Sequence, residues 1–116
     1  EWGNYFRLSF IDDEGGDRTI FELRNSIGEP LGSTVDPPIH SQGASSLRVE
    51  CGYLNDTDAR LTYGLGGHEM CVFLAYTDAE LTIGADSGAN TPMGPNEDGV
   101  FMNETACGRV LAVPSR

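Results

Sequence analysis

The sequence predicts an all-β fold, namely an antiparallel β-sandwich of the jelly-roll or immunoglobulin-like (Ig-like) kind with about eight short strands. Apolar and polar residues alternate with a period of two along most of the chain, whereas helical periodicity is nearly absent. Fifteen glycines and six prolines separate the alternating runs at intervals typical of a sandwich. A closed β-barrel is the alternative architecture. Because 116 residues can bury one modest core, we expect a single domain over residues 1–116.

The first predicted element is a β-hairpin over residues 5–24. Two alternating runs flank an acidic turn that contains Gly15 and Gly16, and this arrangement is typical of a hairpin. Every second residue of each run is expected to face the core. The core-facing residues would be Phe6, Leu8, Phe10, Thr19, Phe21 and Leu23.

The rest of the chain is expected to alternate between short strands and two long loops. Glycine and proline recur over residues 25–46 and predict an irregular connection, with a short edge strand near residues 31–35. Residues 70–76 are apolar on both faces and predict a central strand of the sandwich. A second long loop is expected over residues 85–99. The remaining strands are expected over residues 47–53, 61–65, 81–83, 100–102 and 106–113.

The charge of the chain restricts its partners. It contains no lysine and carries a formal net charge of -11, from eighteen acidic residues and seven arginines. The arginines are scattered singly, so phosphate backbones would be repelled and direct nucleic-acid binding is not expected. No apolar run reaches the roughly 18 residues that a membrane-spanning helix needs. We therefore expect a protein or cell-surface partner that is cationic or neutral.

Three cysteines allow one disulfide and leave one thiol over. We favour a Cys51–Cys71 bridge because it closes a shorter loop than a bridge from either of these cysteines to Cys107 would. Such a bridge is expected to stabilise the fold by about 3 kcal/mol. Cys107 would then be free, or it would link two subunits of a homo-oligomer. No cysteine belongs to a C-x-x-C pair, so the spacing does not indicate a zinc site.

Two sequons suggest where the protein resides. Asn55 and Asn103 each begin an Asn-x-Thr triplet, which is the acceptor motif for N-glycosylation in secreted proteins. Together with a disulfide, they favour an extracellular location, either secreted or exposed on a cell or virion surface.

A dense group of carboxylates at the first turn suggests a cation site. Asp12, Asp13, Glu14 and Asp17 surround the Gly-Gly pair, and several close carboxylate oxygens can bind calcium. The competing interpretation is a solvated turn, since Asp and Gly favour turns for conformational reasons alone. No other cofactor is expected.

Two aromatic residues near the start of the chain are candidates for ligand contact. Tyr5 lies on the polar side of its predicted strand, and Trp2 precedes that strand. Aromatic rings in such places either bind a partner or cap the end of a strand.

No catalytic motif is present, so we expect a protein that is not an enzyme. In size, β content and cysteine count, the chain is broadly similar to small secreted microbial effectors and to β domains on cell or virion surfaces. The expected function is that of an extracellular module acting by binding or assembly, with residues 25–46 and 85–99 as contact loops. One alternative is an acidic mimic of nucleic acid that inhibits a DNA-binding protein. Another is a small secreted hydrolase that uses paired carboxylates.

Overall fold

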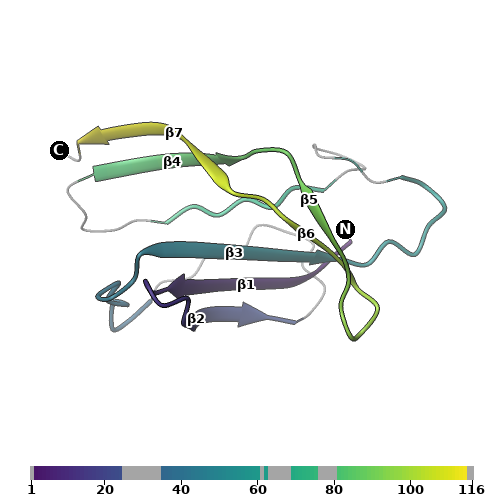
Figure 1. Ribbon diagram of the computed structural model, residues 1–116, viewed down its shortest axis with the longest axis horizontal. Coiled ribbons are helices and arrows are strands. Elements are labelled where there is room, and N and C mark those ends of the chain that lie inside the picture. Colours follow the sequence, from purple (N-terminus) through teal and green to yellow (C-terminus); the bar gives the residue numbers. More distant parts are fainter. Residues whose placement is uncertain (1, 25–34, 61, 63–68, 76–80, 115–116) are drawn as a thin grey trace. The chain divides into compact units, whose positions relative to one another are not determined.

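The computed structural model describes residues 2–24, 35–60, 62, 69–75 and 81–114 (Figure 1). Within these residues the protein is all-β, without a helix, and every strand pair is antiparallel. The seven strands are β1 (Gly3–Ile11), β2 (Asp17–Leu23), β3 (Ser46–Tyr53), β4 (Leu81–Ser87), β5 (Thr91–Pro95), β6 (Phe101–Glu104) and β7 (Cys107–Pro114).

The strands form three open sheets, ordered β2-β1-β3, β4-β7 and β5-β6, and in the described part of the chain none closes into a barrel. The all-β, antiparallel prediction is therefore confirmed, whereas the sandwich stays a prediction. The chain divides into two compact units, Glu1–Leu74 and Ala75–Arg116, which are described separately below.

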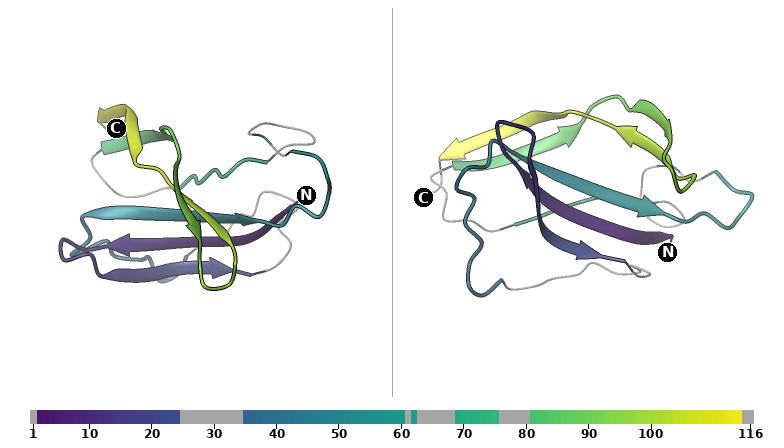
Figure 2. Two further views of the ribbon diagram at one scale, coloured as in Figure 1. Left: turned by 45° about the vertical axis from the view of Figure 1, so that its right-hand side comes forward. Right: turned by 60° about the horizontal axis from the view of Figure 1, so that its bottom comes forward.

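The first unit is built on the sheet β2-β1-β3, with β1 in the centre (Figure 2). The register confirms the predicted hairpin: Phe6 pairs with Leu23, and Leu8 pairs with Phe21. Among the described residues, Leu8 is the hydrophobic residue that is buried, and it lies at the centre of the apolar face. The rings of Phe6 and Phe21 pack on this face with their centroids 6.0 Å apart. Strand β3 adds the cross-strand neighbours Leu47, Val49 and Cys51 to the same face.

A β-bulge in the hairpin corrects one predicted orientation. Opposite Leu8 and Ser9 the register moves from Phe21 to Thr19, so that Ile20 is the extra residue. A bulge reverses the alternation between its two sides, so residues before Ile20 lie on the opposite face from the one that the alternation of Phe21 and Leu23 predicts. Thr19 therefore lies on the polar face, and the prediction that it faces the core was wrong.

The predicted central strand over residues 70–76 is not formed as such. Glu69 donates its amide to the carbonyl of Thr62 over 3.1 Å, but residues 70–75 belong to no strand. The predicted strand over residues 61–65 lies almost wholly outside the described residues. The predicted disulfide is present, and it links Cys51 on β3 to Cys71 with a Cα–Cα distance of 6.0 Å. The apolar residues that predicted a central strand here are half-buried or exposed in the structure.

The second unit contains two hairpin-like pairs, β4-β7 and β5-β6. The predicted long loop over residues 85–99 was wrong, because β4 extends to Ser87 and β5 lies inside this range. Proline and glycine at Pro92, Gly94 and Pro95 suggested a loop. A two-stranded sheet consists of edge strands only, where a missing amide donor need not break the ladder. The irregular connection predicted before β3 is confirmed for residues 35–45, while residues 25–34 lie outside the described part.

Candidate functional site

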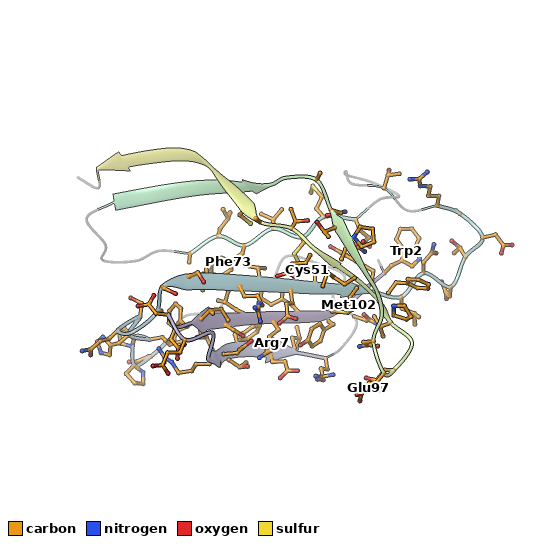
Figure 3. All side chains as sticks on the ribbon, viewed as in Figure 1. Trp2, Arg7, Cys51, Phe73, Glu97 and Met102 are labelled. Atoms are coloured by element: carbon orange, nitrogen blue, oxygen red, sulfur yellow. A yellow bond between two sulfur atoms is a disulfide. The ribbon has the colours of Figure 1, made fainter. Side chains whose placement is uncertain are left out.

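The polar face of the first sheet carries an ion-pair network centred on Arg7. Arg7 on β1 lies between Glu22 on β2 and Glu50 on β3. Its guanidinium contacts Glu50 over 3.1 Å and Asp17 over 2.7 Å. The same group donates from Nε to the hydroxyl of Thr19 over 2.9 Å. Figure 3 labels Arg7 on the sheet.

The bulge at Ile20 explains how this network is assembled. Uninterrupted alternation would place Asp17 and Thr19 on the side of Phe21. The bulge moves both residues to the side of Arg7, where Asp17 also accepts from Arg48 over 3.0 Å. The periodicity of the sequence carries no trace of this irregularity, so sequence reasoning could not find the network.

The network balances its own charge. Partial burial lowers the pKa of Arg7, but the carboxylates of Asp17 and Glu50 outweigh this effect, so the pKa is raised overall. Each described carboxylate on this face has an arginine partner. The members are Arg7, Arg24, Arg48, Asp17, Glu22 and Glu50. A nucleic-acid mimic needs a continuous negative stripe, and this face does not supply one.

Tyr5 lies on the polar face, as its place in the sequence predicts. The guanidinium of Arg24 lies 4.9 Å from the centre of its ring, which is a cation–π geometry. Burial raises the pKa of Tyr5, and the charges of Glu50 and Glu22 raise it further. Gly52 lies opposite, where a Cβ would approach the Tyr5 Cβ to 2.8 Å. The ring is therefore held between the sheet and an arginine.

Trp2 is half-buried, and its backbone is held on both sides. Its amide donates to a carboxylate oxygen of Glu69 over 2.7 Å, and its carbonyl accepts from Leu54 over 2.8 Å. These contacts resemble the capping of a strand end. A ligand-binding role for Trp2 and Tyr5 stays a prediction.

The carboxylates of the first turn do not converge on one point. Asp12 accepts from the amides of Glu14 and Gly16 over 2.9 and 2.7 Å and thereby stabilises the turn. Asp17 is paired with arginines on the polar face, while Asp13 and Glu14 are exposed. Among the described residues, no three Asp, Glu, His or Cys side chains lie close enough to hold a metal ion. Calcium binding by Asp12, Asp13, Glu14 and Asp17 stays a prediction without support from this geometry.

A shallow hollow lies beside the first turn and bears on the hydrolase alternative. Its volume is about 310 Å³, and it opens to solvent between Phe10, Arg18 and Gly43. The two carboxylates in its lining, Asp12 and Asp17, are engaged by backbone amides and by arginines, respectively. Asp12 accepts both amides through one carboxylate oxygen, Oδ1, whereas both oxygens of Asp17 are paired with arginines. The hydrolase alternative stays a prediction.

The two sequons have different surroundings. Asn55 is exposed, and its Oδ1 accepts from the amide and hydroxyl of Thr57 over 3.1 and 2.7 Å. Its Nδ2 donates to the carbonyl of Ala59 over 2.7 Å. Asn103 lies on β6, and the hydroxyl of Thr105 donates to Asn90 over 2.6 Å. Both asparagines are exposed, and their glycosylation stays a prediction.

Cys107 is exposed and carries a free thiol. This agrees with the predicted pairing of the other two cysteines, Cys51 and Cys71. Whether Cys107 links two subunits in solution stays a prediction.

The β5-β6 hairpin, which we call the contact hairpin (residues 91–104), overlaps the predicted contact loop over residues 85–99 and carries exposed apolar side chains that the sequence analysis did not single out. Phe101, Met93 and Val100 are 79%, 59% and 52% exposed. Met93 occupies the irregularity between Pro92 and Gly94, which pushes it out of the ladder. Proline and glycine in this stretch predicted a loop instead of a strand, so the sequence did not indicate which side chains the strand exposes.

The turn of the contact hairpin is well defined. Asn96 accepts from the amides of Asp98 and Val100 over 3.0 and 2.9 Å. Gly99 adopts a left-handed conformation with φ 76°, which favours glycine. Figure 3 shows Glu97 at the tip of this hairpin. The apolar side chains are therefore presented on an ordered support.

Comparison of the chain with models of protein families, with curated proteins and with solved structures gives no match. Among the described residues, no helix is long and apolar enough to cross a membrane.

Proposed function

We propose that this protein is an extracellular, non-catalytic binding module and that the contact hairpin is its recognition element. The observation that carries the proposal is the exposure of three large apolar side chains on one hairpin, namely Phe101, Met93 and Val100. Large apolar side chains gathered on one exposed element are typical of an interaction site. Methionine adds a flexible, polarisable contact that adapts to the shape of a partner.

The charge of the contact hairpin and the residues next to it indicates the kind of partner. Residues 88–107 contain Glu97, Asp98 and Glu104 and no lysine or arginine. In contrast to the polar face of the first sheet, no ion pair within the described residues neutralises these acids. Complementary potentials favour a partner protein with an apolar cleft and a basic rim.

The disulfide supports the proposed setting. A Cys51–Cys71 bridge persists in oxidising environments and is rare in reducing ones. An extracellular location also fits a module that acts through an exposed surface rather than through a catalytic pocket.

The proposal is tested with defined probes, namely a basic amphipathic peptide and the same peptide with its lysines replaced by glutamates. We expect the protein to bind the basic peptide and to bind it less tightly at high salt, because screening weakens the attraction of exposed charges. Fluorescence anisotropy of labelled peptide measures both affinities. Equal binding of the two peptides would contradict the proposed charge complementarity.

A matched pair of variants locates the binding surface. Phe101→Ser should weaken binding of the basic peptide by about tenfold or more, since truncating an exposed aromatic anchor removes its buried area in the complex. Leu54→Ser is the control, because Leu54 is also exposed but belongs to the first unit. If both variants bind like the wild type, or lose binding equally, the contact hairpin is not the recognition element.

A further inference from the structure

The face of the contact hairpin that carries Phe101 also carries the acceptor asparagine of a sequon, Asn103. The irregularity of this hairpin lies on β5, so the residues of β6 alternate regularly. Alternation therefore places Phe101 and Asn103 on the same face. Two residues along a strand rise by about 6.8 Å, so the two side chains are direct neighbours.

The rest of this face is apolar. Pro95 pairs with Phe101 across the hairpin, and Pro92 pairs with Asn103. Residues that lie directly opposite each other on two strands share a face. All four residues are exposed, and Asn103 is the one among them with a polar side chain.

The amide group of Asn103 is free to carry a sugar. Its side chain makes no hydrogen bond to another described residue. The hydroxyl that completes the acceptor triplet belongs to the exposed Thr105 and donates to Asn90 over 2.6 Å. In the other sequon, by contrast, Nδ2 of Asn55 already donates to the carbonyl of Ala59 over 2.7 Å.

The ring of Phe101 suits the first sugar of a glycan on its neighbour. A pyranose ring presents a face of C–H hydrogens, and the face of an aromatic ring carries negative charge density that attracts them. Phe101 is 79% exposed, so its ring is accessible to such a sugar. Covering the ring also removes apolar area from water, which is favourable.

We propose that Asn103 carries an N-linked glycan whose first sugar packs on the ring of Phe101 and masks the contact hairpin. The donor is a lipid-linked oligosaccharide diphosphate. Transfer joins Nδ2 of Asn103 to C1 of the first sugar, breaks the bond between C1 and the diphosphate, and releases the lipid diphosphate and the amide proton. The masking rests on the proposed function, since the glycan then restricts binding to copies whose Asn103 is unmodified.

Asn55 provides a matched control. It also follows an aromatic residue, Tyr53, by two positions. However, β3 ends at Tyr53, so strand alternation does not place the two side chains on one face. Asn55 also belongs to the first unit rather than to the contact hairpin.

The first experiment determines which asparagines carry a glycan in the full chain secreted from eukaryotic cells. Enzymatic release of glycans in heavy-oxygen water converts each glycosylated asparagine to a labelled aspartate, which peptide mass spectrometry locates. We expect a label at Asn103 and the loss of one glycan from the intact mass of Asn103→Gln. An unmodified Asn103 in the secreted protein would overturn the proposal.

The second experiment tests the masking with the basic amphipathic peptide described above. The glycosylated wild type should bind this peptide about tenfold or more weakly than Asn103→Gln secreted from the same cells, because the glycan covers the Phe101 anchor. Asn55→Gln should bind as weakly as the wild type. Equal binding by the wild type and Asn103→Gln would overturn the masking. Absence of binding by both would contradict the proposed function, and the third experiment then decides the sugar–ring contact by itself.

The third experiment measures the contact between the sugar and Phe101 without any partner. Thermal unfolding is followed by circular dichroism for glycosylated and unglycosylated forms, all in an Asn55→Gln background. The glycan should raise Tm by a few degrees when Phe101 is present and should lose this effect in Phe101→Ser. Met102→Ser is the control and should keep the effect, because Met102 lies on the other face of β6. An equal rise in all three proteins, or no rise in any, would overturn the contact.

Discussion

The first sheet and the contact hairpin differ in how their charged and apolar side chains are partnered. In the sheet, arginines on β1, on β3 and directly after β2 neutralise the carboxylates of the polar face, and Leu8 is buried at the centre of the other face. In the contact hairpin, Phe101 and Met93 are exposed, and within the described part of the chain its acids have no arginine partner. The polar face of the sheet pairs its own charges, whereas the proposed function assigns the exposed side chains of the hairpin to a partner. We therefore expect mutations in the sheet to change stability and mutations in the hairpin to change binding.

The disulfide is expected to have the largest effect on stability. The Cys51→Ser/Cys71→Ser double variant should lower the free energy of unfolding by about 3 kcal/mol, because the unfolded chain regains the freedom of a closed loop. Urea unfolding followed by fluorescence of Trp2, the single tryptophan, measures the change in the first unit. Cys107→Ser is the control and should leave the midpoint unchanged. An unchanged midpoint in the double variant would mean that the bridge does not constrain the first unit.

Removing a charge should separate the two regions. Arg7→Met leaves Glu50 without its partner and Asp17 with Arg48 alone, and we expect a loss of about 1–2 kcal/mol in stability. Glu97→Gln in the contact hairpin should change stability by less than about 0.5 kcal/mol, since surface substitutions usually do. The same urea unfolding measures both variants. An equal loss of unfolding free energy in the two variants would mean that the charges of the sheet and of the hairpin contribute alike to stability.

The smallest effect is expected from a flaw inside the sheet. Ser9 is fully buried, and within the described residues its hydroxyl has no hydrogen-bond partner. Ser9→Ala removes this unsatisfied group and should raise the free energy of unfolding by about 1 kcal/mol. Ser45→Ala is the matched control, because its hydroxyl donates to the carbonyl of Ile11 over 3.1 Å. A Ser9→Ala protein that is less stable than the wild type would show that the hydroxyl is satisfied in solution.

Much of the first hairpin could be predicted because its signals are local. Alternation around Phe6 and Leu8 and a turn with adjacent glycines lie within a few residues of one another. The structure also explains the role of the acids in that turn, where Asp12 accepts two backbone amides. The calcium interpretation counted carboxylates along the sequence, but the strand alternation and the bulge direct Asp17 away to Arg7.

The candidate sites were harder to predict, because exposure depends on what packs against a residue. Residues 70–75 look like a buried strand in the sequence, yet Val72 and Leu74 are exposed. Likewise, proline and glycine between Pro92 and Pro95 suggested a loop, although this stretch forms an edge strand that presents Met93. Apolar periodicity shows which side chains share a face but not whether another element covers that face.

The sequence by itself determined the all-β character, the first hairpin, the acidic surface and the pool of cysteines, because alternation, turn residues and composition are local properties. Only the tertiary structure decided that Ile20 forms the bulge, that Asp17 joins the Arg7 network and that Cys51 meets Cys71. The bulge and the ion pair depend on the register within the hairpin, and the disulfide depends on the contact of two segments 20 residues apart. A shift of one residue in that register reverses the face of every side chain that follows.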